Sequence, residues 1–322
     1  MSKDTLKHIS PDEIKENPDN PRLFFRPEEM ATLLTSISKF GIKVPITVYP
    51  AARGFTLIDG ERRWRCAKKL NLKTIPAIIQ PKPSPLENLL LMFNIHALRE
   101  QWDYLTIANK LPEVIDRFKA ENDGRTPNEI ELSELTGLTR GQIRRCNYLL
   151  ELPSRYKRML MEELALPKGL QQLSEDFFIE MERALHTIEN RVPSALVDKD
   201  HSRNALIAKF RENVIKNVTD FRKLSKIATS IDNVGVKHED ARQAIRQILS
   251  PNNNVSIQGV FATHFEIRYD ERKLTLHLRS ISDYLKSFLN NGQPLGNNVL
   301  VQLRALRGLI DKVLKKANDG RR

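Results

Sequence analysis

The chain has 322 residues, of which 40% are hydrophobic, and its formal net charge is +12. The hydrophobic share is enough to fill cores, which excludes a wholly disordered chain, and the length corresponds to two or three domains. No apolar run approaches the roughly 20 residues of a membrane helix, and the first residues carry no apolar signal region. The excess of positive charge favours a polyanionic partner.

The N-terminal pattern alternates strands with helices. Residues 9–25 are rich in Pro, Asn and Asp and predict turns around a short strand, and residues 27–40 predict a helix that ends at Gly41. Strands are predicted at 44–50, 55–59 and 74–79, and a helix begins at Glu61. This alternation predicts a small α/β domain over residues 1–100.

From residue 84 onward the chain is predicted to be helical. Ser84 to Glu87 form a capping box ahead of an apolar helix. A second helix is predicted over about 103–119, in which Pro112 is expected to break or kink the helix. The pattern continues to residue 250 and predicts an all-helical middle domain over residues 101–250.

Residues 126–152 have the pattern of a helix-turn-helix. A capping box is predicted at Thr126–Glu129, Gly137 suits the tight turn, and a further box at Thr139–Gln142 opens the second helix. The side chains predicted on its exposed side are of the types that reach phosphates and base edges: Thr139, Arg140, Gln142, Arg144, Arg145 and Asn147. The alternative is a purely structural helical hairpin with a solvated face.

Residues 257–322 are predicted to form a small C-terminal module. After a linker at 250–256, alternating apolar residues at 263–269 and 273–280 predict a β-hairpin. The last helix has a heptad-like seam that either packs on this hairpin or forms a dimer interface: Val299, Leu303, Leu306, Ile310 and Val313. The fold class expected for the whole chain is therefore α+β.

The two cysteines lie inside helical patterns. Cys66 and Cys146 are predicted to be reduced core thiols rather than a disulfide, which fits a cytoplasmic protein. The seven histidines are scattered, and no His, Cys and Asp cluster has metal-ligand spacing, which argues against a metal-dependent nuclease.

The stretch LIDGERRWRCAKKL, residues 57–70, places charges at a strand-to-helix turn. Gly60 allows close backbone approach, and a helix N-terminus presents free N–H groups to an anion. Arg62 and Arg63 add forked donors that match phosphate oxygens. The alternative is a solvated helix surface, which is the usual place for basic residues at a helix start.

This stretch resembles the signature box of the ParB/RepB partition-protein family, whose members read Gly-Glu-Arg-Arg at this point. Three further segments are similar to family motifs: the Asn-Pro-Arg segment and the following helix and strand within residues 17–48, NIHALREQW at 94–102, and the helix-turn-helix ending in LLELP at 149–153. The resemblance covers roughly residues 8–165.

The resemblance implies a dimeric clamp that binds CTP with Mg²⁺ and loads on double-stranded DNA at a centromere-like site. It further implies a ParA-type ATPase as partner, no membrane, and a cytoplasmic location on a nucleoid or plasmid during chromosome or plasmid segregation. Matched by position, the expected nucleotide-binding residues are Gly60, Glu61, Arg62, Arg63, Pro45, Ile46, Thr47 and Asn94. Asn94 matches the asparagine that helps hold the metal.

The chain departs from the family pattern beside Asn94. The family motif is Glu-Asn-Ile-Gln-Arg, but here Phe93 replaces the glutamate, Ala97 replaces the arginine, and Arg99 lies two residues further on. A phenyl ring neither accepts a proton nor orients water, which argues against CTP hydrolysis while leaving nucleotide binding intact. No catalytic residue is therefore assigned.

Two other functions remain open. The N-terminal fold also resembles small-molecule kinases and other nucleotide-using enzymes, in which Glu61 would be an acid/base candidate, although such an enzyme has no use for a helix-turn-helix. The second is a site-specific transcriptional regulator that has lost nucleotide use, which Phe93 and Ala97 favour.

Overall fold

The computed structural model describes residues 5–20, 25, 27–96, 103–251, 253–292 and 294–319. The strands are β1 (Thr5–Ile9), β2 (Ile14–Lys15), β3 (Ile46–Pro50), β4 (Phe55–Asp59) and β5 (Ile75–Ile79). The helices are α1 (Pro27–Phe40), α2 (Glu61–Lys69), α3 (Pro85–His96), α4 (Tyr104–Glu121), α5 (Glu129–Thr136), α6 (Arg140–Glu151), α7 (Ser154–Ala165), α8 (Glu175–Arg191), α9 (Lys199–Arg211), α10 (Asp220–Val234), α11 (His238–Leu249), α12 (Ile257–His264), α13 (Glu266–Asn291) and α14 (Asn297–Asp319).

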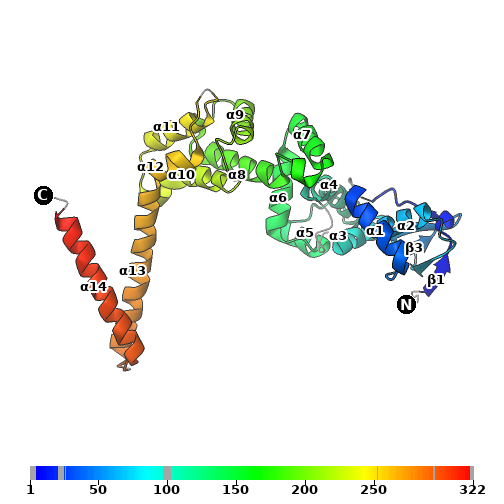
Figure 1. Cartoon of the computed structure of the whole chain (residues 1–322), viewed down its shortest axis with the longest axis horizontal. Helices are drawn as coiled ribbons and strands as arrows, with labels where there is room; N and C mark the ends of the chain where they lie inside the picture. The colour runs from blue at the N-terminus through cyan, green and yellow to red at the C-terminus, as the bar shows by residue number, and fades with distance from the viewer. Residues whose placement is uncertain are drawn as a thin grey trace.

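The protein is mostly helical with one small mixed sheet, which confirms the expected α+β class. Figure 1 shows the sheet with α1 and α2 at one end, two groups of helices following in chain order, and α13 and α14 projecting from the far side. None of the described helices is both long and apolar enough to cross a membrane.

The sheet has the strand order β1-β5-β3-β4-β2. β3 is the central strand: it pairs in parallel with β5 and antiparallel with β4. Its inward residues Ile46 and Val48 are fully buried, whereas β1 at the edge is almost wholly exposed. The predicted strands at 44–50, 55–59 and 74–79 are confirmed within one or two residues.

The N-terminal core packs α2 against this sheet. Trp64 is buried among the inward strand residues and its Nε1 donates to the carbonyl of Pro11 at 2.8 Å. Because α2 begins directly after β4, this packing fixes where the first turn of α2 lies relative to β3.

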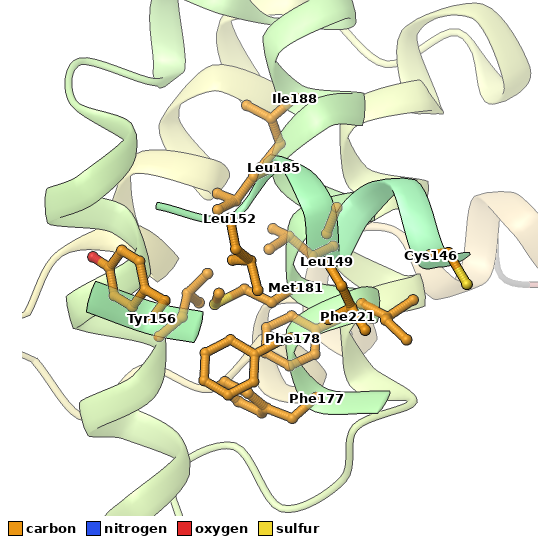
Figure 2. Close-up of a cluster of buried hydrophobic side chains, with 14 of the residues drawn as sticks. Cys146, Leu149, Leu152, Tyr156, Phe177, Phe178, Met181, Leu185, Ile188 and Phe221 are labelled. Atoms are coloured by element: carbon orange, nitrogen blue, oxygen red, sulfur yellow. The ribbon is translucent and has the colours of Figure 1, made fainter. Parts of the chain in front are cut away.

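A second, larger hydrophobic cluster runs continuously from Leu86 in α3 to Phe265 after α12. Figure 2 shows part of it, in which Leu149 from α6, Phe177 and Phe178 from α8 and Phe221 from α10 come together. The ring centroids of Phe177 and Phe221 lie 5.3 Å apart in an edge-on arrangement, a favourable geometry for aromatic rings. The predicted helical character is thereby confirmed for residues 84–96 and 103–250, the described part of this range.

Two local predictions about these helices need correction. Pro112 was expected to break or kink its helix, and the break is wrong: α4 runs through it over 18 residues, because one lost backbone hydrogen bond is outweighed by the buried apolar side of the helix. The kink stays a prediction. The capping box before α5 is formed by Asn128 and Glu131, not by Thr126 and Glu129, since both tetrads fit the pattern and asparagine is the stronger N-cap.

The predicted C-terminal β-hairpin is also wrong. Residues 266–291 form the single helix α13. The segment 270–273 contains no Gly or Asn for the positive φ that a tight hairpin turn requires. The same stretch also has apolar residues at helical spacing, at Ile267, Leu274, Leu278 and Ile281, so helix formation satisfies its backbone.

The segment 250–256, predicted to be a linker, is tied to the helical cluster. The buried Nζ of Lys209 donates to the carbonyls of Ile248 and Val255 at 2.7 and 3.1 Å and to Oδ1 of Asn253 at 2.8 Å. Ile257 and Phe261 of α12 then extend the same core. The domain limits at 100 and 257 stay predictions.

Candidate functional site

The charged turn is built on an unusual glycine. Gly60 is the N-cap of α2 and has φ +100°, a backbone conformation that side chains disfavour. A Cβ at Gly60 would lie 2.6 Å from Cγ2 of Ile46, so the turn sits directly on β3. No side chain caps this helix, which leaves first-turn N–H groups directed outward, as an anion site requires.

Arg63 fixes the start of β3 beside this turn. Its Nη1 donates to the carbonyls of Val44 and Pro45, both at 2.6 Å, and its Nη2 pairs with Asp59 at 2.9 Å. Thr47 is paired with Asp59 across the sheet. The structure therefore brings Pro45, Ile46 and Thr47 together with residues 60–63, although Ile46 itself is fully buried beneath the turn.

Arg62 is more loosely held than Arg63. Its Nη2 lies 3.4 Å from a carboxylate oxygen of Glu29 in α1 and 3.3 Å from the Glu29 carbonyl. Both of these side chains are partly exposed, and an exposed ion pair of this kind contributes little stability. Arg62 can therefore exchange its carboxylate for a phosphate at small cost, whereas Arg63 is committed to backbone carbonyls.

Glu61 is held by a cation, Arg65, and by the amide of Asn20. Its Oε1 accepts from Nε of Arg65 at 2.7 Å, and its Oε2 accepts from the amide of Asn20. The Glu61 side chain is nearly buried, and its carboxylate thus orients the first turn of α2 rather than facing solvent.

The two positions examined on α3 have different environments. Asn94 is exposed, and its Nδ2 donates to the carbonyl of Leu90 at 3.0 Å. Phe93 has no exposed surface and belongs to the large hydrophobic cluster. Ala97 and Arg99 lie outside the described residues. Among the residues that are described, no group of three His, Cys, Asp or Glu is placed to hold a metal ion.

A polar network that the sequence analysis missed links the turn to the helical part. Asn17 and Asn88 are buried and exchange amide hydrogen bonds at 3.1 and 3.4 Å. Asp19 accepts from Asn88 at 3.0 Å and from Arg117 of α4 at 2.9 Å, while Asn20 donates to Glu61. The Asn- and Asp-rich composition of residues 16–20 was the available signal, and it was interpreted as turns and as part of the Asn-Pro-Arg segment, without partners in the helical part.

Arg117 is the centre of this network on the helical side. Burial lowers the pKa of its guanidinium, but the hydrogen bonds and charges of Asp19 and Glu113 outweigh that effect and raise the pKa. The residue is therefore held as a cation between α4 and the segment before α1.

The two helices of the predicted helix-turn-helix form α5 and α6. Gly137 has φ +73° at the C-cap of α5, and Thr139 and Gln142 form the predicted capping box of α6. Ile143, Cys146 and Leu149 are buried on the inner side of α6, and Figure 2 shows Cys146 and Leu149 among the buried side chains. Burial raises the pKa of the Cys146 thiol to about 12, which makes it an inert core thiol.

The predicted contact residues of α6 divide into two sets. Arg140 and Arg144 are 54% and 60% exposed, and Thr139 and Asn147 are exposed beside them, with Gln142 partly exposed in the cap. Arg145 is 28% exposed, pairs with Asp176 of α8, and lies 4.7 Å from the ring centroid of Tyr104. Its contact with DNA stays a prediction, but its guanidinium is turned toward α8.

Glu175 lies at the junction behind α6. Its Oε1 accepts from the backbone N–H of Leu105 at 2.6 Å and so caps α4 from the first turn of α8. Burial raises the pKa of the Glu175 carboxyl to about 7; the Leu105 N–H lowers it and the neighbouring Asp103 raises it further. No sequence pattern pointed to this residue, because its partner is 70 residues away.

Comparisons with known proteins agree with this geometry. Residues 1–91 match the family model of the ParB N-terminal domain. A probable chromosome-partitioning protein ParB of Mycobacterium leprae is 36% identical over 154 residues, which are 46% of this chain and 43% of that protein. Stage 0 sporulation protein J of Bacillus subtilis is 25% identical over 236 residues, 67% of this chain and 80% of that protein.

A ParB of Caulobacter crescentus has been solved in two complexes that resemble this chain. The complex with the centromeric parS site is 18% identical with a TM-score of 0.41, over 75% of this chain and 99% of that one. The complex with CTP-gamma-S is 23% identical with a TM-score of 0.29, over 56% and 92%.

The chain matches less than half the length of the Mycobacterium leprae relative. The family model nevertheless covers the whole sheet and the charged turn. Residues 1–91 thus carry a ParB N-terminal domain, which is the family shown for this part of the chain.

Proposed function

We propose that the chain is a site-specific DNA-binding partition protein whose DNA binding is gated by CTP. The observation that carries this proposal is a combination in one chain: an open helix N-terminus at Gly60 beside β3, and a downstream α5–α6 pair that exposes arginines. A helix N-terminus with adjacent arginines suits a triphosphate, and exposed arginines on a capped second helix suit the major groove.

The residues present fit a nucleotide. Gly60 lets the turn lie directly against Ile46 of β3, the first-turn N–H groups are uncapped, and Arg62 has a partner that exchanges easily. Pro45 and Thr47 lie beside the turn where the base is expected, while Glu61 and Arg63 hold the turn in shape. When bound, CTP would place its triphosphate against the first-turn N–H groups of α2 and Arg62.

Asn94 is the residue proposed to help hold the Mg²⁺ that accompanies CTP. Its side-chain oxygen is of the type that magnesium accepts, and Asn94 lies on an exposed position of α3. Triphosphate oxygens would supply most of the remaining ligands. Hydrolysis is not part of the proposal, because Phe93 fills the position of the family glutamate with a ring buried in the core.

The test is calorimetry with CTP, ATP, GTP and UTP in the presence of Mg²⁺. We expect CTP to bind the wild type and binding to be lost in Arg62→Ala. Lys69→Ala is the matched control, since it removes one exposed positive charge from the same helix away from its first turn. Absence of binding by any nucleotide, with or without DNA, would refute the nucleotide part of the proposal.

The DNA contacts are proposed for the exposed side of α6. Arg140, Arg144 and Asn147 would reach base edges and phosphates, and Thr139 and Gln142 would approach the backbone at the helix start. The net charge of +12 supports a nucleic-acid partner over an acidic small molecule. Selection of bound duplexes from a randomised pool tests this assignment, and recovery of no common sequence would refute it.

A homodimer is proposed from the C-terminal arm. α13 and α14 expose many large apolar side chains that the chain itself does not cover, among them Leu274, Leu276, Leu309 and Val313. Exposed apolar stripes of this length are typical of helix–helix interfaces. Light scattering should report a dimer for the wild type and a smaller species for Leu309→Asp with Val313→Asp. A wild-type monomer at micromolar concentration would contradict it.

The remaining assignments follow the family resemblance. A ParA-type ATPase is the proposed protein partner, and the proposed location is the cytoplasm, on a nucleoid or plasmid. A DNA-binding transcriptional regulator that has lost nucleotide use is the second candidate. The burial of Phe93 favours it, because no acidic side chain occupies that position. Calorimetric CTP binding would exclude the second candidate, and selective DNA binding without binding of any nucleotide would favour it.

A further inference from the structure

An ion-pair cluster joins α5 to the exposed side of α6. The Oε1 atom of Glu129 lies 3.1 Å from Nε of Arg140 and 3.0 Å from Nε of Arg144. Its Oε2 lies 3.5 Å from Nη2 of Arg144. One carboxylate therefore holds two arginines that are a single helical turn apart.

Capping does not explain this cluster. The N-terminus of α5 is capped by Asn128 and Glu131, and Glu131 has its own partner, Arg125. Glu129 is not a member of that capping box. An ion pair between exposed side chains also adds little to stability. The placement of Glu129 under both guanidinium groups therefore points to what the arginines do.

We infer that Glu129 is a positioning residue that holds Arg140 and Arg144 for readout of guanine in the major groove. This inference rests on the proposed DNA-binding function of α6. Arginine has five donors in a planar fork, and its contact with guanine uses the terminal pair against O6 and N7. Glu129 engages the Nε side of both guanidinium groups and, at 3.5 Å, Nη2 of Arg144. The opposite edge of each guanidinium, which carries the terminal pair of donors, is not used by this carboxylate.

The shared carboxylate also affects binding that is independent of sequence. Three side chains with charges of +1, +1 and −1 attract phosphate less strongly than two unpaired arginines. Burial raises the pKa of the Glu129 carboxyl, but the hydrogen bonds and charges of Arg140 and Arg144 outweigh burial and lower it. The Glu129 carboxylate therefore stays charged at the pH at which DNA is bound. Its charge weakens non-specific contacts with phosphate, while its hydrogen bonds orient the guanidinium groups of Arg140 and Arg144.

The geometry specifies the DNA chemistry that would be recognised. Residues i and i+4 of a helix are about 6 Å apart along its axis, and base pairs stack about 3.4 Å apart. Two oriented forks on one face therefore suit guanines about one or two base pairs apart. Arg145 is excluded from this readout because Asp176 and Tyr104 hold its side chain.

The test compares Glu129→Gln with Glu131→Gln in the full chain. Both changes remove one negative charge from the first turn of α5, and glutamine still serves in the capping box. The DNA is the sequence that the wild type selects from a randomised duplex pool, and a scrambled duplex reports non-specific binding. The measurements are the two dissociation constants, their salt slopes and the thermal midpoint.

We expect the ratio of specific to non-specific affinity to fall about tenfold in Glu129→Gln, on the scale of one bidentate base contact. In Glu131→Gln this ratio should change by less than about twofold, because only a background charge is lost. Guanine preference at the affected positions should weaken only in Glu129→Gln. The thermal midpoints of the two variants should agree, since a structural role would separate them.

Each outcome decides a different statement. If the wild type selects no sequence, the proposed DNA-binding function fails. If the wild type selects a sequence and both variants keep the same affinity ratio, the positioning role of Glu129 is refuted and the DNA-binding function stands. If the selected site contains no guanine that responds to Glu129→Gln, the readout chemistry is refuted as well.

Discussion

Gly60→Ala tests the geometry of the charged turn most directly. An alanine Cβ would lie 2.6 Å from Cγ2 and 3.0 Å from Cβ of Ile46, and 3.1 Å from Nη2 of Arg63. Ile46 is fully buried in the central strand and cannot move away freely. Arg63 is held by two carbonyls and Asp59, so its guanidinium is also restrained.

Two physical costs add up at this position. Left-handed backbone at a residue with a side chain costs roughly 1–2 kcal/mol, and forcing an extra methyl group into a packed site costs about 1–3 kcal/mol. The expected loss is thus about 2–5 kcal/mol in the free energy of unfolding of the N-terminal domain. Gly41→Ala is the matched control: Gly41 has φ +69° and nothing within 4 Å of its Cβ position, so only the backbone cost applies.

Urea unfolding followed by tryptophan fluorescence measures the difference. The chain has two tryptophans, and Trp64 is buried in the N-terminal core. In a Trp102→Phe background, Trp64 alone reports this domain. With an m-value of about 1–3 kcal/mol per molar, the two variants should differ in midpoint by about 1 M urea. Equal midpoints for Gly60→Ala and Gly41→Ala would refute the close packing of this turn on β3.

Three other predictions follow from contacts in the helical part. Arg117→Met should lower the free energy of unfolding by about 1–3 kcal/mol, because it removes the partner of Asp19 in a partly buried network. Lys119→Met on the same helix should lower it by about 0.5 kcal/mol or less, and equal urea midpoints of the two variants would contradict this. Arg144→Ala should weaken specific DNA binding by about 1–3 kcal/mol and relax the sequence preference. Arg145→Ala should instead lower thermal stability by uncovering Asp176 and Tyr104, and the reverse pattern would contradict the division of α6 into two sets. The pKa of the Glu175 carboxyl is raised from 4.5 to about 7, so the folded state favours its protonated form. The stability that the protonated carboxyl contributes is complete below pH 4.5 and is lost as the pH rises through 7. Glu175→Gln should therefore gain stability relative to wild type between pH 5 and 8, and parallel pH profiles of the two proteins would contradict this.

The local elements were predictable from the sequence because their causes are local. Turn glycines such as Gly60 and Gly137, the Thr139–Gln142 cap and the apolar periodicity of α6 each depend on residues within a few positions of one another. The same kind of evidence misled at residues 263–280, where alternating and helical spacings coexist in one stretch. The backbone then took the form that needs no positive φ at 270–273.

The charge of each arginine was visible in the sequence, but its partner was not. Arg144 and Arg145 are adjacent, yet Arg144 faces solvent beside Glu129 and Arg145 faces α8. Successive side chains of a helix are rotated by about 100°, so the two point to different sides. The position of α8 decides which of these sides is covered. Asp19 and Arg117 are 98 residues apart and meet because α4 packs near the segment before α1. Sequence alone determined which groups exist and which local elements carry them. The packing of the helices on one another, which depends on contacts distant in the chain, decided which groups pair and which remain at the surface.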